Sequence, residues 1–163
     1  EQIETAIAGL EGVYIANYNC PGQIVITGYR QGVEKASEVL SQAGAKRVLP
    51  LKVSGPFHSP MMKEAGDKLE QVLQKTELTP LRIPYMTNVT AEYVRDIQET
   101  KKLLREQVAS SVRWQKSMER MIADGVTTFV EIGPGKTLAG FLRKISRDVK
   151  VINIASWEDR EKL

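Results

Sequence analysis

The apolar residues of this chain change their pattern repeatedly, from short strand-like runs to the three-to-four spacing of helices, and this change limits the fold more than any other feature. Residues 128–132 and 149–154 predict strands, and the helical spacing of residues 138–145 predicts a helix between them. Strands that alternate with helices favour a parallel sheet. The predicted fold class is therefore α/β.

The first third of the chain predicts a second, smaller unit. In order, the patterns indicate a helix at 3–10, strands at 13–18 and 23–27 around a turn, a helix at 33–43 that ends at Gly44, and a strand at 47–53. This order is that of a ferredoxin-like split βαβ unit without its first strand. Because the chain also starts at Glu1, already in helical spacing, we expect a piece of a longer protein.

The middle of the chain predicts mainly helices. It predicts a helix from Ser59 to residue 72, a short strand at 84–87, a polar loop, and helices at 97–108 and 114–122. Asp96 and Glu99 have the spacing of a capping box at the start of the helix predicted at 97–108. We place a domain boundary at Gly55–Pro56, which divides the chain into residues 1–55 and 56–163.

Composition excludes several classes of protein. The apolar fraction of 42% and the charged fraction of 26% are ordinary for a water-soluble domain, and no apolar run is long enough to cross a bilayer. The net charge of +3 comes from short basic pairs such as Lys46–Arg47, so we expect no nucleic-acid partner. A single cysteine, Cys20, cannot form an internal disulfide, and no spacing fits zinc, so a reducing, cytoplasmic location is expected.

His58 is the only histidine, and it lies in a loop between a predicted strand and a predicted helix. Ser59 and Pro60 are typical of the N-cap and first position of a helix, so His58 comes just before a helix N-terminus. The positive end of the helix dipole favours a neutral imidazole, which is what a general base requires. The spacing alone favours a histidine that only packs or caps in the loop over a general base.

A base of this kind needs a nucleophile, and the nearby candidates are weak. Ser59 is expected to serve as a helix cap, Ser54 has no supporting pattern, and Cys20 lies in a turn without an activating charge. No Gly-x-Ser-x-Gly elbow occurs in the sequence. From the residues alone, none of these candidates is convincing.

The segment Gly133–Thr137 ends in Gly-Lys-Thr between a strand and a helix, which suggests a phosphate-binding loop. A Walker A loop needs a glycine five positions before Gly135, and this chain has Val130 there. The glycines and the proline are instead typical of a tight turn.

Several of these segments together resemble bacterial malonyl-CoA:acyl-carrier-protein transacylases. The resemblance rests on five segments in the same order and at similar spacing: Asn17-x-Asn19-x-Pro21-Gly22-Gln23-x-Val25-Ile26-x-Gly28, Gly44-Ala45-Lys46-Arg47, Gly55-Pro56-Phe57-His58-Ser59, Val112-x-Trp114 and Glu131-Ile132-Gly133-Pro134-Gly135-Lys136. The resemblance implies an α/β-hydrolase-like large acyltransferase domain, of which residues 56–163 are the C-terminal part, with an inserted ferredoxin-like subdomain in residues 1–55.

The resemblance also implies a reaction and its residues. A serine that this chain lacks would accept malonyl from malonyl-CoA and pass it to the phosphopantetheine thiol of acyl-carrier protein. His58 matches the family's catalytic base, and Gln107 matches a residue whose backbone carbonyl orients that base. Phe57 matches a position that favours malonyl over methylmalonyl, and Asn17 and Asn19 are candidates for the substrate pocket, although they also suit a purely structural hairpin role.

The expected partners are malonyl-CoA, acyl-carrier protein and the N-terminal remainder of the same enzyme, without a metal or bound organic cofactor. That remainder is expected to supply the serine elbow, the arginine that pairs with the malonyl carboxylate and a glutamine of the oxyanion hole. Two alternatives stay open. Instead of the C-terminal part of this enzyme, the chain would be a non-catalytic fragment that binds carrier protein or CoA, or part of an acyltransferase domain of a polyketide synthase.

Overall fold

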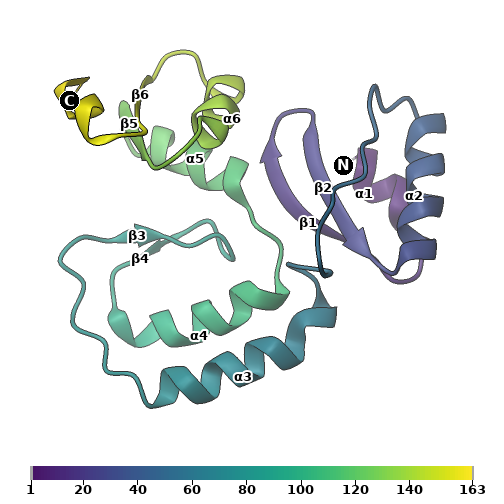
Figure 1. Cartoon of the computed structure of the whole chain (residues 1–163), viewed down its shortest axis with the longest axis horizontal. Coiled ribbons are helices and arrows are strands. Elements are labelled where there is room, and N and C mark those ends of the chain that lie inside the picture. Colours follow the sequence, from purple (N-terminus) through teal and green to yellow (C-terminus); the bar gives the residue numbers. More distant parts are fainter. Residues whose placement is uncertain (1, 163) are drawn as a thin grey trace.

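The N-terminal elements form an antiparallel hairpin with two helices packed against it. In the computed structural model, which describes residues 2–162, β1 (Val13–Cys20) pairs with β2 (Gln23–Gly28), and α1 (Gln2–Ile7) and α2 (Arg30–Gln42) lie beside them (Figure 1). Their shared core is centred on Ile7, Val13, Ala36 and Leu40. The predicted hairpin and both predicted helices are confirmed.

Helix α2 ends as predicted at a glycine with left-handed backbone. Gly44 has a φ of 90°, and the amide of Ala45 donates to the carbonyl of Leu40 at 2.9 Å. This bond satisfies a carbonyl that the helix leaves open at its end.

The strand predicted at 47–53 is wrong. Those residues form no strand, and Leu49, Leu51 and Val53 are 58–64% exposed, although Val48 reaches the core of the first group. A strand exists only when a neighbour accepts its backbone hydrogen bonds, and within residues 2–162 no segment pairs with this one. The side-chain pattern of a strand is present, but a partner is not.

The second group is a pair of helices with a short hairpin beside them. The one-turn helix η1 (Pro60–Met62) leads into α3 (Lys63–Gln74), which packs along α4 (Ile97–Ala109). The Asp96 side chain caps α4 by accepting from the amide of Gln98 at 2.9 Å, so the predicted start is confirmed. The predicted polar loop contains a strand, because β4 (Tyr93–Val94) pairs with β3 (Tyr85–Met86).

The third group contains the predicted parallel strands. Helix α5 (Trp114–Ala123) precedes β5 (Thr128–Ile132), which runs parallel to β6 (Lys150–Ile154), with α6 (Thr137–Ile145) between them in sequence and η2 (Trp157–Lys162) after them. This confirms the α/β class. Val130 and Ile132 of β5 are 39% and 79% exposed, which is unusual because parallel strands are normally covered on both faces.

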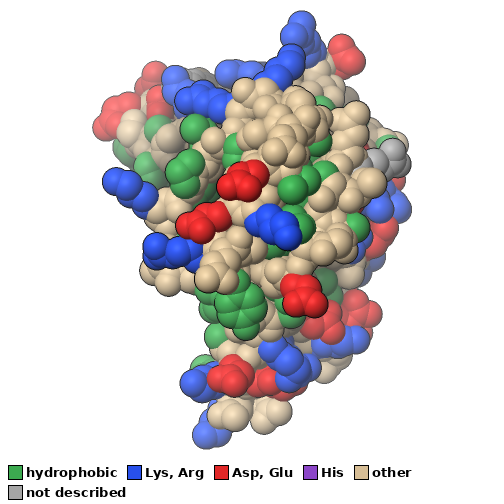
Figure 2. Space-filling model, turned by 90° about the vertical axis from the view of Figure 1, so that its right-hand side faces the viewer, with side chains coloured by type: hydrophobic (Ala, Val, Ile, Leu, Met, Phe, Trp, Pro, Cys, Tyr) green, Lys and Arg blue, Asp and Glu red, His purple; other side chains and the backbone are tan. Residues whose placement is uncertain are grey.

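Strand β1 connects the first group to the others, because it packs against both α5 and α6. On the face shown in Figure 2, acidic and basic side chains are interspersed with apolar ones and form no field of a single sign. Within residues 2–162, no helix combines the length and hydrophobicity needed to span a bilayer.

Candidate functional site

His58 has a strained backbone at the entrance to the η1–α3 helical segment. Its φ is 59°, in the left-handed region, and Ala91 is the only other non-glycine residue among residues 2–162 with a positive φ. Such a conformation costs on the order of 1–2 kcal/mol outside glycine, and strained residues of this kind cluster at functional sites. The side chain of His58 is half-buried.

The imidazole of His58 contacts the last turn of α4. Its Nδ1 lies 3.1 Å from the backbone oxygen of Gln107, because the packing of α3 along α4 brings together residues that are 49 positions apart. A carbonyl oxygen only accepts, so this bond requires the proton on Nδ1 and leaves the lone pair of Nε2 free. The arrangement can therefore accept a proton at Nε2.

The side chain of Gln107 supports the same turn. Its Nε2 donates to the carbonyl of Ser110 at 3.3 Å and lies 3.4 Å from Nδ1 of His58. Because Nδ1 already donates to the carbonyl of Gln107, we assign this second contact as packing. The structure thus brings the two predicted catalytic residues together.

Ser59 begins the helix as predicted, but its hydroxyl does not cap it. The backbone oxygen of Ser59 accepts from the amide of Met62, whereas its Oγ donates backwards to the carbonyl of Pro56 at 2.6 Å. Ser59 is fully buried. The predicted side-chain cap is therefore wrong, because the hydroxyl closes a turn from Pro56 to Ser59 that holds His58 in its left-handed conformation.

The predicted substrate residues lie on two separate segments. Phe57 is 47% exposed beside His58, whereas Asn17 and Asn19 lie on β1, half-buried and 9% exposed respectively. Asn17 forms an isolated parallel bridge with Val112, three residues after the end of α4. The link between these asparagines and His58 therefore runs through the segment that follows Gln107.

Cys20 is a poor nucleophile in this structure. It is 1% exposed, and its Sγ lies 3.7 Å from Oε1 of Gln23. Burial raises the pKa of the Cys20 thiol, against a smaller lowering effect of Lys144. A raised pKa leaves little thiolate at neutral pH, which agrees with an idle thiol.

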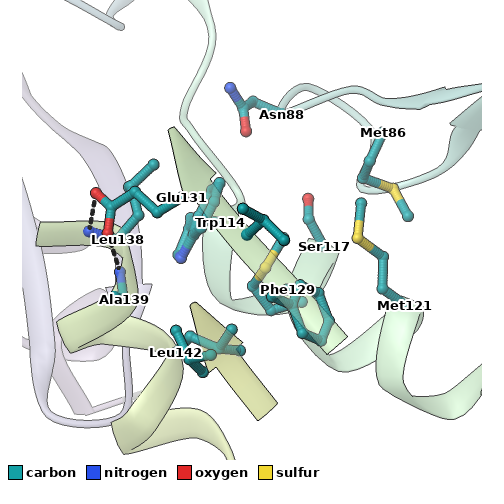
Figure 3. A pocket seen from close by; sticks show the side chains of 13 residues that line it. Met86, Asn88, Trp114, Ser117, Met121, Phe129, Glu131, Leu138, Ala139 and Leu142 are labelled. Carbon is teal, nitrogen blue, oxygen red and sulfur yellow. Dashed lines mark hydrogen bonds between the residues drawn. The ribbon is translucent and has the colours of Figure 1, made fainter. Parts of the chain in front are cut away.

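A groove of about 270 Å³, whose lining does not include His58, lies between β5, α5 and α6 (Figure 3). It is lined mainly by apolar side chains, including Met86, Trp114, Met118, Phe129 and Leu142. The sequence pattern predicted that the apolar stripe of α5 lies in a core; Met118 is buried, whereas Trp114 and Met121 are half-buried along the groove. The indole Nε1 of Trp114 is buried and has no hydrogen-bond partner within residues 2–162.

Glu131 closes the N-terminus of α6. Its carboxylate accepts from the amides of Leu138 at 3.2 Å and Ala139 at 2.8 Å, as the dashed lines in Figure 3 show. A carboxylate therefore already occupies the place where a phosphate would bind. Gly133 and Gly135 have positive φ, as a tight turn requires, so the Gly-Lys-Thr segment is a structural connection. Among residues 2–162, no three His, Cys, Asp or Glu side chains group closely enough to hold a metal ion.

Comparison with known proteins gives consistent matches. The profile of the acyl transferase domain family matches residues 1–161. The malonyl CoA-acyl carrier protein transacylase of Bacillus subtilis (strain 168) is 48% identical over 149 residues, which are 91% of this chain and 47% of that protein. The chain thus spans about half the length of the curated relatives it matches.

Solved structures share the fold. The malonyl-CoA:ACP transacylase of Synechocystis sp. PCC 6803 superposes with a TM-score of 0.91 at 33% identity, over 99% of this chain and 54% of that one. A malonyl-transacylase solved in complex with a type II polyketide synthase acyl-carrier protein gives a TM-score of 0.89 at 34% identity, over 97% and 51%.

Proposed function

The chain belongs to the acyl transferase domain family, and on that premise we propose that it is the C-terminal part of a malonyl-CoA:acyl-carrier-protein transacylase. The observation that carries this proposal is the 3.1 Å contact between Nδ1 of His58 and the carbonyl of Gln107. A carbonyl in this position does the work of the aspartate in a serine triad, because it needs only to hold the tautomer and the ring orientation.

In the proposed reaction His58 acts twice as a base. Its Nε2 removes the proton of a serine hydroxyl, the serine oxygen attacks the thioester carbonyl of malonyl-CoA, and the CoA thiolate leaves with that proton. The phosphopantetheine thiol then gives its proton to Nε2, and its sulfur attacks the malonyl-serine ester. The serine departs with the proton, so the enzyme returns to its starting state.

The serine and the arginine that pairs with the malonyl carboxylate are proposed to come from the other half of the relatives' length. The open side of β5 supports this part of the proposal. The amide of Gly133 donates to the carbonyl of Ile154, and the amide of Lys150 donates to the carbonyl of Thr127. Backbone groups alternate in direction along a parallel strand, so those of Val130 and Ile132 face away from β6. These outward-facing backbone groups suit a further strand of the same sheet, and the exposed side chains, with the groove beside them, suit an element that covers this face.

The division into domains is part of the same proposal. We assign residues 1–55 to a ferredoxin-like subdomain and residues 56–163 to the large domain. The core shared by α1, the hairpin and α2 supports the first assignment, and the separate packing of α3 along α4 supports the second. Malonyl-CoA and acyl-carrier protein are proposed to approach His58 where these two domains meet. A cytoplasmic location is also proposed, with the unpaired Cys20 as its support.

Phe57, Asn17 and Asn19 are proposed to shape the malonyl site. Phe57 is adjacent to the base and exposed, so its ring is available to crowd a methyl branch on the substrate. Asn17 and Asn19 lie on the strand that is tied to Val112, which gives their amides a fixed position relative to His58. A non-catalytic binding fragment would need none of these features, and the strained, oriented histidine favours the enzyme over it.

The test is His58→Ala in the full-length enzyme, with malonyl transfer to acyl-carrier protein as the assay. Loss of a general base should lower the rate by about 10²–10⁴. Thr76→Ala is the control, because Thr76 follows the far end of α3, a helix about 18 Å long that begins after His58. Near-normal turnover of His58→Ala would refute the assignment. Intact mass after brief exposure to malonyl-CoA should also show a malonyl adduct on a serine outside this chain, and an adduct elsewhere would contradict the mechanism.

A further inference from the structure

The three residues that follow α4, Ser110–Val112, lie directly against β1. The hydroxyl of Ser111 donates to the carbonyl of Ile15 at 2.6 Å. The amide of Val112 donates to the carbonyl of Ala16 at 2.8 Å, and the carbonyl of Val112 accepts from the amide of Tyr18 at 2.8 Å. We call Ser110–Val112 the interlobe strap, because it joins β1 to α4, the helix whose Gln107 carbonyl contacts the imidazole of His58.

The hairpin is locally irregular where the strap binds. Ile15 pairs with Ile26 and Asn17 pairs with Val25, so Ala16 between them has no partner on β2. Irregularities of this kind turn backbone groups out of the ladder and are frequent next to active sites. At this irregularity the carbonyl of Ile15 accepts from the hydroxyl of Ser111, and the carbonyl of Ala16 accepts from the amide of Val112.

The other end of the strap is fixed to the proposed base. Gln107 bonds through its side chain to the carbonyl of Ser110, and through its own carbonyl to the imidazole of His58. A connected set of hydrogen bonds of 2.6–3.3 Å thus runs from β1 through the strap to Nδ1 of His58. A displacement of β1 must therefore move the carbonyl that orients the imidazole.

We propose that Ser111 is a positioning residue, whose hydroxyl sets the spacing between β1, which carries Asn17, and the imidazole of His58. Its importance for catalysis rests on the proposed function, but its effect on His58 does not. Of the strap's three contacts with β1, only this one depends on a side chain, because the two bonds of Val112 are made by its backbone. A side-chain bond can be removed without changing the path of the chain.

The tautomer of His58 can be tested without any substrate in the full-length enzyme, where its signal is the one that disappears in His58→Ala. Nitrogen-15 NMR of His58 reports its tautomer, and the exchange rate of the Nδ1 proton reports how firmly the carbonyl of Gln107 holds it. We expect the Nδ1–H tautomer in the wild type. Ser111→Ala should make that proton exchange roughly five- to tenfold faster, the factor that corresponds to about one net hydrogen bond.

Matched variants separate positioning from general loss of stability. Ser37→Ala removes another partly buried serine bond to a backbone carbonyl, of 2.7 Å in α2, and should leave the exchange of His58 unchanged. Ser111→Thr keeps the hydroxyl and should restore the wild-type rate. Ser111→Cys, nearly the same size but a weak donor, should fall between and serves if the alanine variant does not fold.

Two outcomes would overturn the proposal: equal exchange rates in Ser111→Ala and wild type, or an equal increase in Ser37→Ala. In the full-length enzyme, Ser111→Ala should lower kcat more than it raises KM, because it displaces the base more than the substrate. If the enzyme transfers no malonyl while the exchange rates follow the prediction, the proposed function fails and the role of Ser111 stands.

Discussion

Replacement of Gly66 by alanine should loosen the contact between His58 and Gln107, although neither residue is changed. Gly66 lies inside α3, and a Cβ there would be 2.9 Å from the carbonyl oxygen of Arg105 in α4. Ordinary contact begins near 3.4 Å, so the helices must separate by at least about 0.5 Å, because a backbone carbonyl cannot rotate away as a side chain can. Arg105 precedes Gln107 by two residues. A shift of that size would lengthen the 3.1 Å contact of His58 to about 3.6 Å, beyond hydrogen-bond range.

The expected energy follows from two opposing effects. Overpacking costs about 1–3 kcal/mol, and alanine gains about 1 kcal/mol over glycine in a helix. We expect Gly66→Ala to lower the free energy of unfolding by about 1 kcal/mol, measured by urea unfolding. Gly140→Ala is the control, because Gly140 lies in α6 with open space around it, so this variant should be more stable by about 0.5–1 kcal/mol. If Gly66→Ala is stabilised as much as Gly140→Ala, or leaves the Nδ1 proton exchange of His58 unchanged, the reasoning is refuted.

Two further predictions concern Tyr18 and Glu131. Burial, together with the 2.7 Å bond from the Tyr18 hydroxyl to Glu4, raises the pKa of Tyr18 to about 12. Because the folded chain holds this proton more tightly than the unfolded chain, whose pKa is about 10, the stabilisation is complete below pH 10 and is lost as the pH rises towards 12. Urea unfolding of wild type and Tyr18→Phe between pH 9 and 11 should show a steeper decline in wild type, and parallel declines would contradict this. Glu131→Gln removes the negative charge at the N-terminus of α6 and should lower the free energy of unfolding by about 1 kcal/mol. Glu119→Gln, on an exposed face, is the control and should change the free energy of unfolding little. Equal effects of the two variants would be inconsistent with a cap.

Local patterns predicted most of the elements because local forces form them. The start of α4 at Asp96, the end of α2 at Gly44 and the spacing within α5 and α6 each depend on residues a few positions apart. The segment 47–53 has an equally good pattern and forms no strand, because a strand needs a partner that its own sequence does not specify.

The candidate site was harder to predict for the same reason. Nothing in the spacing connects His58 with Gln107, and only the family resemblance paired them; their contact depends on the packing of α3 along α4. The left-handed backbone of His58 and the backward bond of Ser59 are also invisible in the sequence, where Ser-Pro predicts an ordinary cap. No sequence pattern distinguishes Ser111, because a serine after a helix is common and predicts no particular contact.

The proposed base, His58, is held in one orientation before any substrate arrives. A left-handed histidine is unfavourable by on the order of 1–2 kcal/mol, so other contacts must hold it. The hydroxyl of Ser59 closes the turn beneath it, and the carbonyl of Gln107 fixes its ring, while the strap ties that carbonyl to β1. These restraints lie entirely within residues 15–112, and none of them involves β5 or the groove. Completion of the sheet at β5 should therefore bring a nucleophile to an imidazole that is already oriented, and the tautomer of His58 should be the same in this chain and in the full-length enzyme.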